Sequence, residues 1–416
     1  MRRVVITDVG VVTPNANYFE MFSDSLKQGK SGLDEIDCFD ASAFPARIVG
    51  QVKNLDIAGL QKRFPVLKAT NDRKIFIGLS AFLQIAEKVA ATSDVCPVNL
   101  GSSLEQFLMD KVFQLSPGIF ELDTYMSAAA NGLDKPYIET PLDYFGNIIK
   151  ETFSITGPNY LNCSACTAST QAIGHSFHMI RDGRYDRIIT GGFDSMLNPL
   201  GLGGFSRLGA LCMDNELKAQ AIRPFDVRRQ GTVLGEGAAM LLLEDLGYAK
   251  KHGHQIYAEI IGYGSSFDAF KLSEPDRSGR GISTAIRTAI SDAGMTPDDI
   301  DYINAHGTGT IANDRVETLA IKSVFENRAY DIPVSSVKSM IGHLIGASGA
   351  VEIAAILAMF EGCFISPTIN LEKKDPECDL DYVPLKSRNK KINVVLKNSM
   401  GFGGQNAAIV LKRYYE

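Results

Sequence analysis

Three side chains capable of nucleophilic and proton chemistry each follow a predicted strand: Cys166, His306 and His343. Residues 160–163 read as a short buried strand, and apolar residues at helical spacing begin immediately afterwards, in residues 167–179. A thiol at such a strand-to-helix turn projects from the end of the sheet, beside the free N–H groups and positive dipole end that favour a thiolate. Because a single cysteine is more often an inert core residue, the prediction of a nucleophile depends on the two histidines.

The two histidines lie in glycine-containing loops, residues 304–310 and 335–343, and a third loop of this kind spans residues 398–404. One histidine would suit a generic thiol nucleophile and its base. Two neutral imidazoles that donate N–H hydrogen bonds suit a thioester carbonyl on which negative charge develops, as it does when a malonyl group loses carbon dioxide. We therefore predict an acyl-transfer site, in which the backbone N–H groups of Cys166 and Phe402 form a separate oxyanion hole.

Strands and helices alternate along the chain, and the second half repeats the order of the first. Residues 256–264 repeat the apolar strand, glycine turn and polar loop of residues 3–12. This alternation predicts an α/β protein with parallel sheets covered by helices, built from two duplicated halves at residues 1–255 and 256–416. Active sites of such sheets lie at the carboxyl ends of strands, so we expect the three loops to converge near Cys166.

The composition excludes several classes of function. The chain has 416 residues, is 45% apolar and 22% charged, and has a net charge of −6, which argues against general affinity for nucleic acid. Seven cysteines without paired spacing indicate a reducing, cytoplasmic compartment, and Cys163 and Cys166 lack the second pair of a zinc site. The longest apolar runs, such as residues 353–360, are shorter than a membrane span. We expect no metal, no nucleic acid and no membrane.

Four motifs are similar to those of one enzyme family. They are Ala165-Cys166-Thr167-Ala168, His306-Gly307-Thr308-Gly309-Thr310, Lys338-Ser339-Met340-Ile341-Gly342-His343 and Gly401-Phe402-Gly403-Gly404. Together they resemble the elongating β-ketoacyl-[acyl carrier protein] synthases, condensing enzymes of the thiolase superfamily, and the resemblance covers nearly the whole chain. It implies a thiolase-like α/β fold with five layers in the order αβαβα. It also implies an acyltransferase that forms carbon–carbon bonds.

The resemblance assigns roles to individual residues. Cys166 would hold the acyl chain as a thioester, and Lys338 would organise the two histidines. His306 and His343 would bind the malonyl thioester carbonyl and drive decarboxylation. The further residues that it places around the substrate or in the supporting polar network are Phe402, Phe205, Thr308, Thr310, Met400, Gly403, Glu317 and Asp314.

The resemblance also has consequences for cofactors and partners. Asn304 and Glu352 match positions at which some family members surround a structural cation, but we expect no metal in this chain. No cofactor would be bound by the enzyme itself, because the substrates are carried on the phosphopantetheine of an acyl carrier protein. The family forms dimers, so the expected partners are an acyl carrier protein and either a second copy or a related chain.

Several functions stay open at the level of the sequence. A fatty-acid synthase component would be a homodimer, whereas the active ketosynthase subunit of a type II polyketide synthase would pair with a related chain-length subunit that lacks the cysteine. A thiolase-type acyltransferase on CoA esters would use a second cysteine, and initiating synthases have asparagine where His343 stands. A non-catalytic partner subunit would not require Cys166 together with both histidines.

The sequence departs from the family at three places. Met400 stands beside the gate where fatty-acid members usually have phenylalanine, and its flexible thioether reshapes the pocket entrance. The helix start at residues 70–73 lacks a basic pair, and residues 100–142, which supply pocket wall and dimer contacts in the family, lack the usual glycine pattern. The remaining basic residues expected to meet an acidic carrier protein are Lys68, Arg73 and Lys74. These departures leave the product length and the dimer partner open.

Overall fold

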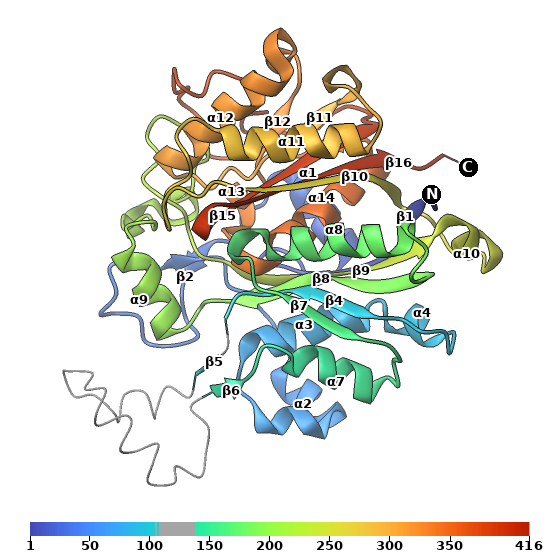
Figure 1. The fold of residues 1–416 in the computed structure, drawn as a ribbon. Helices are drawn as coiled ribbons and strands as arrows, with labels where there is room; N and C mark the ends of the chain where they lie inside the picture. The colour runs from blue at the N-terminus through green and yellow to red at the C-terminus, as the bar shows by residue number, and fades with distance from the viewer. Residues whose placement is uncertain (105, 108–137, 416) are drawn as a thin grey trace.

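The computed structural model describes residues 1–104, 106–107 and 138–415, and its helices and strands form five layers (Figure 1). From top to bottom of that view the helices are α11 (Arg280–Asp292) and α12 (Ile311–Phe325), then α8 (Ala168–Arg181) and α14 (Ser348–Gly362), then α3 (Arg73–Leu83) and α7 (Tyr144–Thr152). Strands fill the two layers between these three helix layers. The arrangement confirms the predicted αβαβα architecture.

The strands of the two halves have the same order on either side of a central junction. The first half contributes β1 (Val4–Val12), β9 (Glu236–Asp245), β8 (Arg187–Ser195), β4 (Val98–Gly101) and β7 (Asn159–Asn162). The second half contributes β10 (Ala258–Phe267), β16 (Gln405–Arg413), β15 (Val394–Gly401), β11 (Tyr302–Asn304) and β12 (Val334–Ser335). β1 and β10 join the halves through three residue pairs, Val4↔Ile260 to Ile6↔Ala258. The duplication is therefore a property of the strand topology as well as of the sequence.

Each half-sheet is mixed, so the expectation of parallel sheets was wrong. In both halves the outer three strands pair in parallel, whereas β9 and β16 pair antiparallel with both of their neighbours. The cause is visible at β15 and β16, which are connected by only residues 402–404. A parallel return needs a crossover of about a dozen residues, so a short connection enforces an antiparallel strand.

The core explains why the central strands are apolar throughout. Alternate side chains of β9 enter two different cores, because successive side chains of a strand point to opposite faces. One core contains Ala238, Met240 and Leu242 together with residues of α3, and the other contains Ala239, Leu241 and Leu243 together with residues of α8 and α14. A strand that is covered on both faces has no polar side and reads as a continuous apolar run.

The remaining helices and strands lie around this framework. The helices are α1 (Phe19–Gln28), α2 (Ile57–Arg63), α4 (Ala86–Ala90), α9 (Pro199–Arg207), α10 (Leu246–Lys251) and α13 (Lys338–Ile341). Three small antiparallel pairs are β2 (Asp34–Glu35) with β3 (Ile48–Val49), β5 (Gln106–Phe107) with β6 (Ile138–Thr140), and β13 (Phe364–Ile365) with β14 (Arg388–Asn389). Most of the segment 100–142, on which product length was expected to depend, lies outside the described residues.

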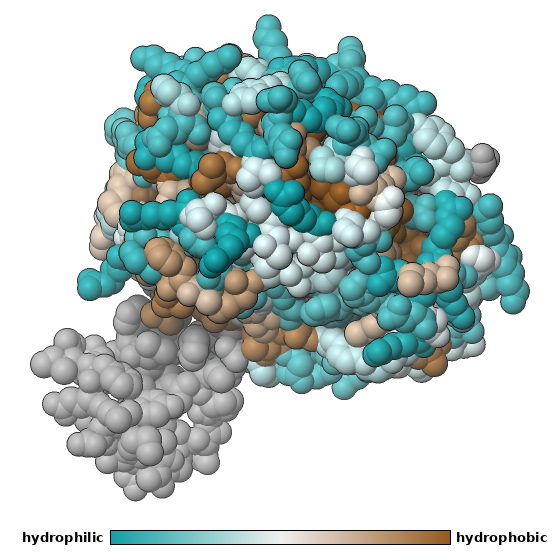
Figure 2. Space-filling model, turned by 45° about the horizontal axis from the view of Figure 1, so that its top comes forward, coloured by the Kyte–Doolittle hydropathy of each residue, from teal (hydrophilic) through white to brown (hydrophobic). Residues whose placement is uncertain are grey.

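One stretch of the described residues is long and apolar enough to cross a membrane. It is Ile345–Gly362, which includes α14 and is longer than the run recognised in the sequence. The stretch is 89% buried inside the protein, where α14 packs between the two sheets against α1 and α8, and this is the situation of a core helix. The outer helix layer differs from the buried, apolar α14 in its polarity. In Figure 2 the upper part of the face, over α11 and α12, is mostly hydrophilic.

Candidate active site

The nucleophile candidate lies at the turn predicted from the sequence. β7 ends at Asn162, a short 3-10 turn spans Ala165–Thr167, and α8 begins at Ala168. Ala165 has a φ of 49°, a left-handed conformation that is costly for a residue with a Cβ atom. This turn points Cys166 inward, where its side chain is only 4% exposed.

Burial changes the expected chemistry of the Cys166 thiol. Removal from water raises the pKa of Cys166 to about 11, although Lys338 and the backbone N–H groups of Phe402 and of Cys166 itself act in the opposite direction. The helix dipole therefore does not by itself make this cysteine a resting thiolate. The N–H groups of Phe402 and Cys166 do lie close to the sulfur, as the predicted oxyanion hole requires.

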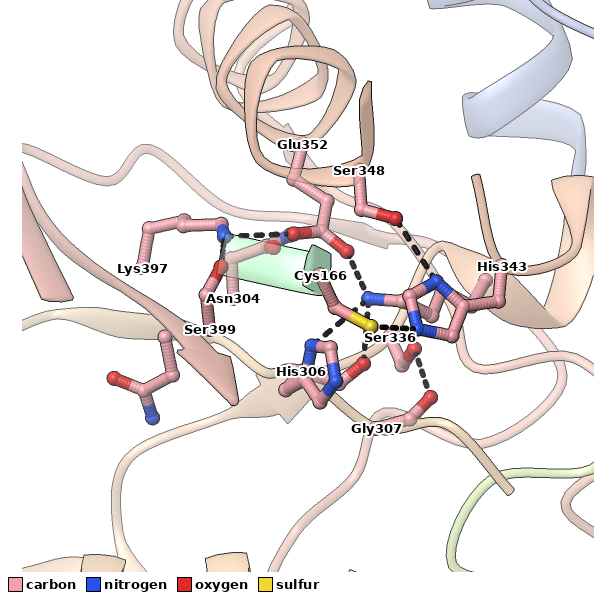
Figure 3. A network of polar contacts seen from close by, with 12 residues as sticks. Cys166, Asn304, His306, Gly307, Ser336, His343, Ser348, Glu352, Lys397 and Ser399 are labelled. Atoms are coloured by element: carbon pink, nitrogen blue, oxygen red, sulfur yellow. Dashed lines mark hydrogen bonds and ion pairs between the residues drawn. The ribbon is translucent and has the colours of Figure 1, made fainter. Parts of the chain in front are cut away.

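His343 presents a hydrogen-bond donor to Cys166. Its Nε2 lies 3.1 Å from Cys166 Sγ (Figure 3). Its Nδ1 accepts the backbone N–H of Ile345 at 3.2 Å and lies 3.0 Å from Ser348 Oγ. A neutral imidazole whose Nδ1 accepts a hydrogen bond carries its proton on Nε2. The hydrogen bonds thus assign His343 as an N–H donor toward the sulfur and whatever binds beside it.

His306 has the same tautomer for a different reason. Lys338 Nζ lies 3.4 Å from His306 Nδ1 and donates to the His306 carbonyl oxygen at 2.7 Å. An ammonium group has only donors, so Nδ1 is the acceptor and Nε2 carries the proton. Lys338 also forms a buried ion pair with Glu352, which fixes the position of its ammonium group.

Both imidazoles are neutral at ordinary pH. Burial and the nearby Lys338 hold the pKa of His306 and of His343 well below 6.5, and Lys397 lowers both further. The ring centroids of the two histidines are 5.3 Å apart, with the rings nearly perpendicular at 82°. Two neutral N–H donors therefore line the same cavity as Cys166.

Glu317 and Asp314 support the loop of the first histidine, as the sequence predicted for a polar network. Glu317 accepts the backbone N–H groups of His306 at 2.7 Å and Gly307 at 2.8 Å. Asp314 accepts the N–H of Gly309 at 3.2 Å and pairs with the buried Arg229. Burial raises the pKa of both carboxyl groups. Neither side chain lines the cavity, so both act on the loop.

A cavity of about 360 Å³ contains most of the predicted substrate residues. Those that line it are Cys166, His306, His343, Thr308, Thr310, Met400, Phe402 and Phe205. The rings of Phe205 and Phe402 are stacked, with centroids 6.0 Å apart. Gly403 is not among the lining residues; instead it has a φ of 78° and donates its N–H to Leu272 O at 2.6 Å, while Gly401 lines the cavity. Gly403 therefore shapes the loop and does not face the substrate space.

Two basic residues expected to meet a carrier protein are used inside the protein. Arg73 forms a bidentate ion pair with the fully buried Glu236. Lys74 is 5% exposed, lies 3.2 Å from Asp72, and donates to the carbonyl oxygen of Leu104. The expectation for Arg73 and Lys74 was wrong, because both are already paired with buried carboxylates, and Lys68 alone of the three remains exposed.

Sequence reasoning missed Lys397, a fully buried lysine at the end of the network. Its ammonium group lies 2.9 Å from Glu352 Oε2 and 2.9 Å from Thr170 Oγ1, and it donates to Ser399 Oγ. Glu352 thus joins two lysines, Lys338 on one oxygen and Lys397 on the other. Figure 3 shows Glu352 next to Lys397. The available signal was a charged residue in the middle of β15, directly after its apolar residues Val394–Leu396.

Comparisons with known proteins place the chain in a family. Residues 1–249 match the N-terminal domain of β-ketoacyl synthases and residues 257–372 match their C-terminal domain. The chain belongs to the β-ketoacyl synthase family. Relatives include 3-oxoacyl-[acyl-carrier-protein] synthase 2 of Coxiella burnetii, which is 38% identical over 100% of this chain and 99% of that protein. Another is the tetracenomycin polyketide synthase ketoacyl synthase alpha subunit of Streptomyces glaucescens, 36% identical over 99% of this chain and 97% of that protein.

Solved structures of ketosynthases have the same fold. The ishigamide ketosynthase/chain length factor is 30% identical, with a TM-score of 0.85 over 100% of both chains. A ketosynthase in complex with its type II acyl-carrier protein is 29% identical, with a TM-score of 0.82 over 100% of both chains. The five-layered arrangement of Figure 1 is therefore the arrangement of this family.

Proposed function

We propose that this β-ketoacyl synthase family member joins a Cys166-bound acyl chain to a malonyl unit by decarboxylative Claisen condensation. The observation that carries the proposal is the pair of neutral Nε2–H donors, His306 and His343, in one cavity with the sulfur of Cys166. Two donors suit a carbonyl oxygen on which charge builds, and their neutrality means that they can stabilise an enolate without protonating it. Lys338 positions His306 for this role.

The reaction divides into three balanced steps. In the first, Cys166 Sγ attacks the acyl thioester, and the carrier thiol leaves with the proton that the cysteine gives up. In the second, the bond between the malonyl α-carbon and its carboxylate breaks, carbon dioxide departs, and the electron pair forms an enolate held by the two histidines. In the third, the enolate carbon attacks the acyl carbonyl, and the tetrahedral oxyanion collapses with return of the electron pair to Cys166 sulfur, which takes up a proton from solvent to restore the thiol. The N–H groups of Cys166 and Phe402 serve the oxyanion of the first and third steps.

The lining of the cavity suits a thioester substrate. Cys166 and both histidines line it, Thr308 and Thr310 supply hydroxyl groups, and Phe402 forms part of the wall. The substrates are carried on the phosphopantetheine of an acyl carrier protein, and no cofactor is needed by the enzyme itself. An acyl carrier protein is the partner of a similar solved ketosynthase, which supports the same partner here.

The pathway has two candidates. The Coxiella relative supports fatty-acid elongation, whereas the tetracenomycin relative and the ketosynthase solved with a chain length factor support the active subunit of a type II polyketide synthase. In both, the enzyme is cytoplasmic and dimeric, with halves divided at residues 255 and 256. A thiolase-type reaction on CoA esters is disfavoured, because Cys166 is the only cysteine that lines the cavity among the described residues.

The proposal is tested by separating the steps with Cys166→Gln. The variant cannot form the acyl thioester but keeps both histidines, so chain elongation falls to background while malonyl decarboxylation continues. Elongation is measured by mass spectrometry of the carrier-bound product, and decarboxylation by release of labelled carbon dioxide from malonyl carrier protein. If the wild-type protein acquires no acyl adduct on Cys166 with any chain length, the proposed nucleophile is wrong.

A further inference from the structure

Lys397 carries a fully buried charge that the proposed reaction does not use. Lys397 is 0% exposed, and burying an ammonium group costs several kcal/mol unless its hydrogen bonds are replaced. Three oxygen atoms offset this cost: Thr170 Oγ1 and Ser399 Oγ accept hydrogen bonds from the ammonium, and Glu352 Oε2 forms an ion pair with it at 2.9 Å. The ammonium therefore lies in an oxygen cage of the kind that surrounds a bound monovalent cation.

The cage continues beyond the three contacts. Asn304 is the register partner of Lys397 across the parallel pair β11 and β15, and it is fully buried. Its Oδ1 accepts no hydrogen bond within the described part of the chain, while its Nδ2 donates to Tyr302 Oη at 3.2 Å. The residue paired with Lys397 in the sheet thus has a buried amide oxygen without a hydrogen-bond partner among the described residues.

These residues do not fit a separate metal ion. Asn304 and Glu352 correspond to positions that surround a cation in some family members, but here the oxygen of Glu352 that faces the cage pairs with Lys397 at 2.9 Å. A metal beside it would place two positive charges on the same oxygens. Within the described residues, no group of three His, Cys, Asp or Glu side chains is arranged to hold a metal.

We infer that Lys397 is a positioning residue whose ammonium group takes the place of a bound cation behind the active site. It acts through a chain of contacts: Lys397 holds one oxygen of Glu352, Glu352 holds Lys338 by its other oxygen, and Lys338 holds Nδ1 and the carbonyl of His306. Lys397 touches neither the cavity nor the reacting atoms. Its part is to keep Glu352 turned toward Lys338 and to balance the buried carboxylate charge.

The test compares two substitutions of the same lysine. Lys397→Ala removes the ammonium group and leaves an empty space lined by the same oxygen atoms. A small cation from solution can therefore enter that space. Lys397→Met removes the charge but fills the volume, so it cannot be rescued. Lys412→Ala removes an exposed lysine from the neighbouring strand β16 and is the control. Each protein is assayed in ammonium chloride and in tetramethylammonium chloride, whose cation is too large for the cage, at about 0.1 M and equal ionic strength.

Decarboxylation of malonyl carrier protein is the first readout and rests on the proposed function. We expect the decarboxylation rate of both Lys397 variants to fall about 10- to 100-fold, the usual effect of removing a partner that orients a site residue. Ammonium restores most of the lost rate to Lys397→Ala and none to Lys397→Met. A wild-type rate in Lys397→Ala, or a loss that ammonium does not reverse, overturns the inference.

The midpoint of thermal unfolding is the second readout and does not depend on the proposed function. Ammonium raises the midpoint of Lys397→Ala relative to tetramethylammonium, and leaves Lys397→Met, Lys412→Ala and the wild type unchanged. If Lys397→Ala folds only in ammonium, the inference is supported; if it stays unfolded in both salts while Lys397→Met folds, it is contradicted. Failure of the wild type to release carbon dioxide would refute the proposed function alone.

Discussion

The two histidines have the same tautomer but differ in their contact with the sulfur of Cys166. His343 Nε2 contacts Cys166 sulfur, whereas none of the described contacts joins His306 to the sulfur. His306→Ala is therefore expected to slow malonyl decarboxylation about 10²- to 10³-fold, as loss of one oxyanion donor does, while acylation of Cys166 continues. The measurements are labelled carbon dioxide release and acyl-adduct formation by mass spectrometry.

His343→Ala supplies the comparison for that experiment. Because this side chain contacts the sulfur as well as the cavity, we expect it to slow both steps. Equal effects of the two substitutions on acylation would show that the histidines are not divided in this way.

The pH dependence of decarboxylation follows from the lowered pKa values of the two histidines. A lowered pKa means that the neutral, donating form persists as the pH falls, because protonation begins only well below 6.5. A histidine with its ordinary pKa would be about nine-tenths protonated at a pH one unit below it. We expect the rate of carbon dioxide release to be nearly constant between about pH 7.5 and 5.5. A tenfold fall across that range would contradict neutral histidines held by burial and Lys338.

The sequence predicted the contact partners at this scale better than it predicted their ionisation. Cys166, His306 and His343 converge because each follows a strand, and strand order determines where such loops meet. The thiolate prediction considered the helix end alone, and desolvation, which requires knowledge of burial, raises the pKa of Cys166 instead. Lys397 escaped notice because an isolated lysine in a strand is usually solvated.

At the scale of elements, the position of Cys166 depends on the close approach of α8 to β4. A Cβ atom on Gly101 would lie 2.2 Å from the backbone nitrogen of Ser169, in the first turn of α8. Gly101→Ala therefore must displace backbone, and we expect it to lower the free energy of unfolding by about 1–3 kcal/mol. It also slows acylation of Cys166, because the same turn carries the sulfur. Denaturant unfolding and the acylation rate check both effects.

A matched glycine exists in α9. An added Cβ on Gly204 would meet no atom within 4 Å, so Gly204→Ala is expected to leave stability and acylation unchanged or to stabilise the helix slightly. Equal destabilisation by the two substitutions would show that the close packing of α8 on β4 is not the source of the cost.

Helices and strands were predictable from the sequence where apolar residues recur at regular spacing. They were less predictable where the place of a strand in the sheet determines its burial. The helix after Cys166 was predicted at residues 167–179 and spans Ala168–Arg181. The strand before it was expected to be buried, yet β7 is the last strand of its sheet and Tyr160 is 38% exposed. The glycine-rich residues around Phe205 form helix α9, which Pro199 begins and Asn198 caps.

In the part of the chain that the structure describes, a sheet edge lies next to the active-site turn. β7 pairs with β4 on one side, and on its other side the described residues offer no strand. An unpaired edge is a template for another strand, and the apolar, partly exposed Tyr160 lies on it. The position is consistent with the proposed dimer, since pairing along β7 would bring the partner within a few residues of Cys166.

This edge gives the last prediction. Tyr160→Asp adds a buried, unpaired charge to any interface that covers β7, which costs several kcal/mol in the complex but little in the free chain, where the side chain is solvated. We expect the wild type to elute as a dimer, alone or with a co-expressed cysteine-free relative, and Tyr160→Asp to elute as a monomer with an unchanged unfolding midpoint. Light scattering coupled to size exclusion gives the masses. Tyr18→Asp, at an exposed tyrosine outside β7, is the control, and a monomeric Tyr18→Asp with a dimeric Tyr160→Asp would place the interface elsewhere.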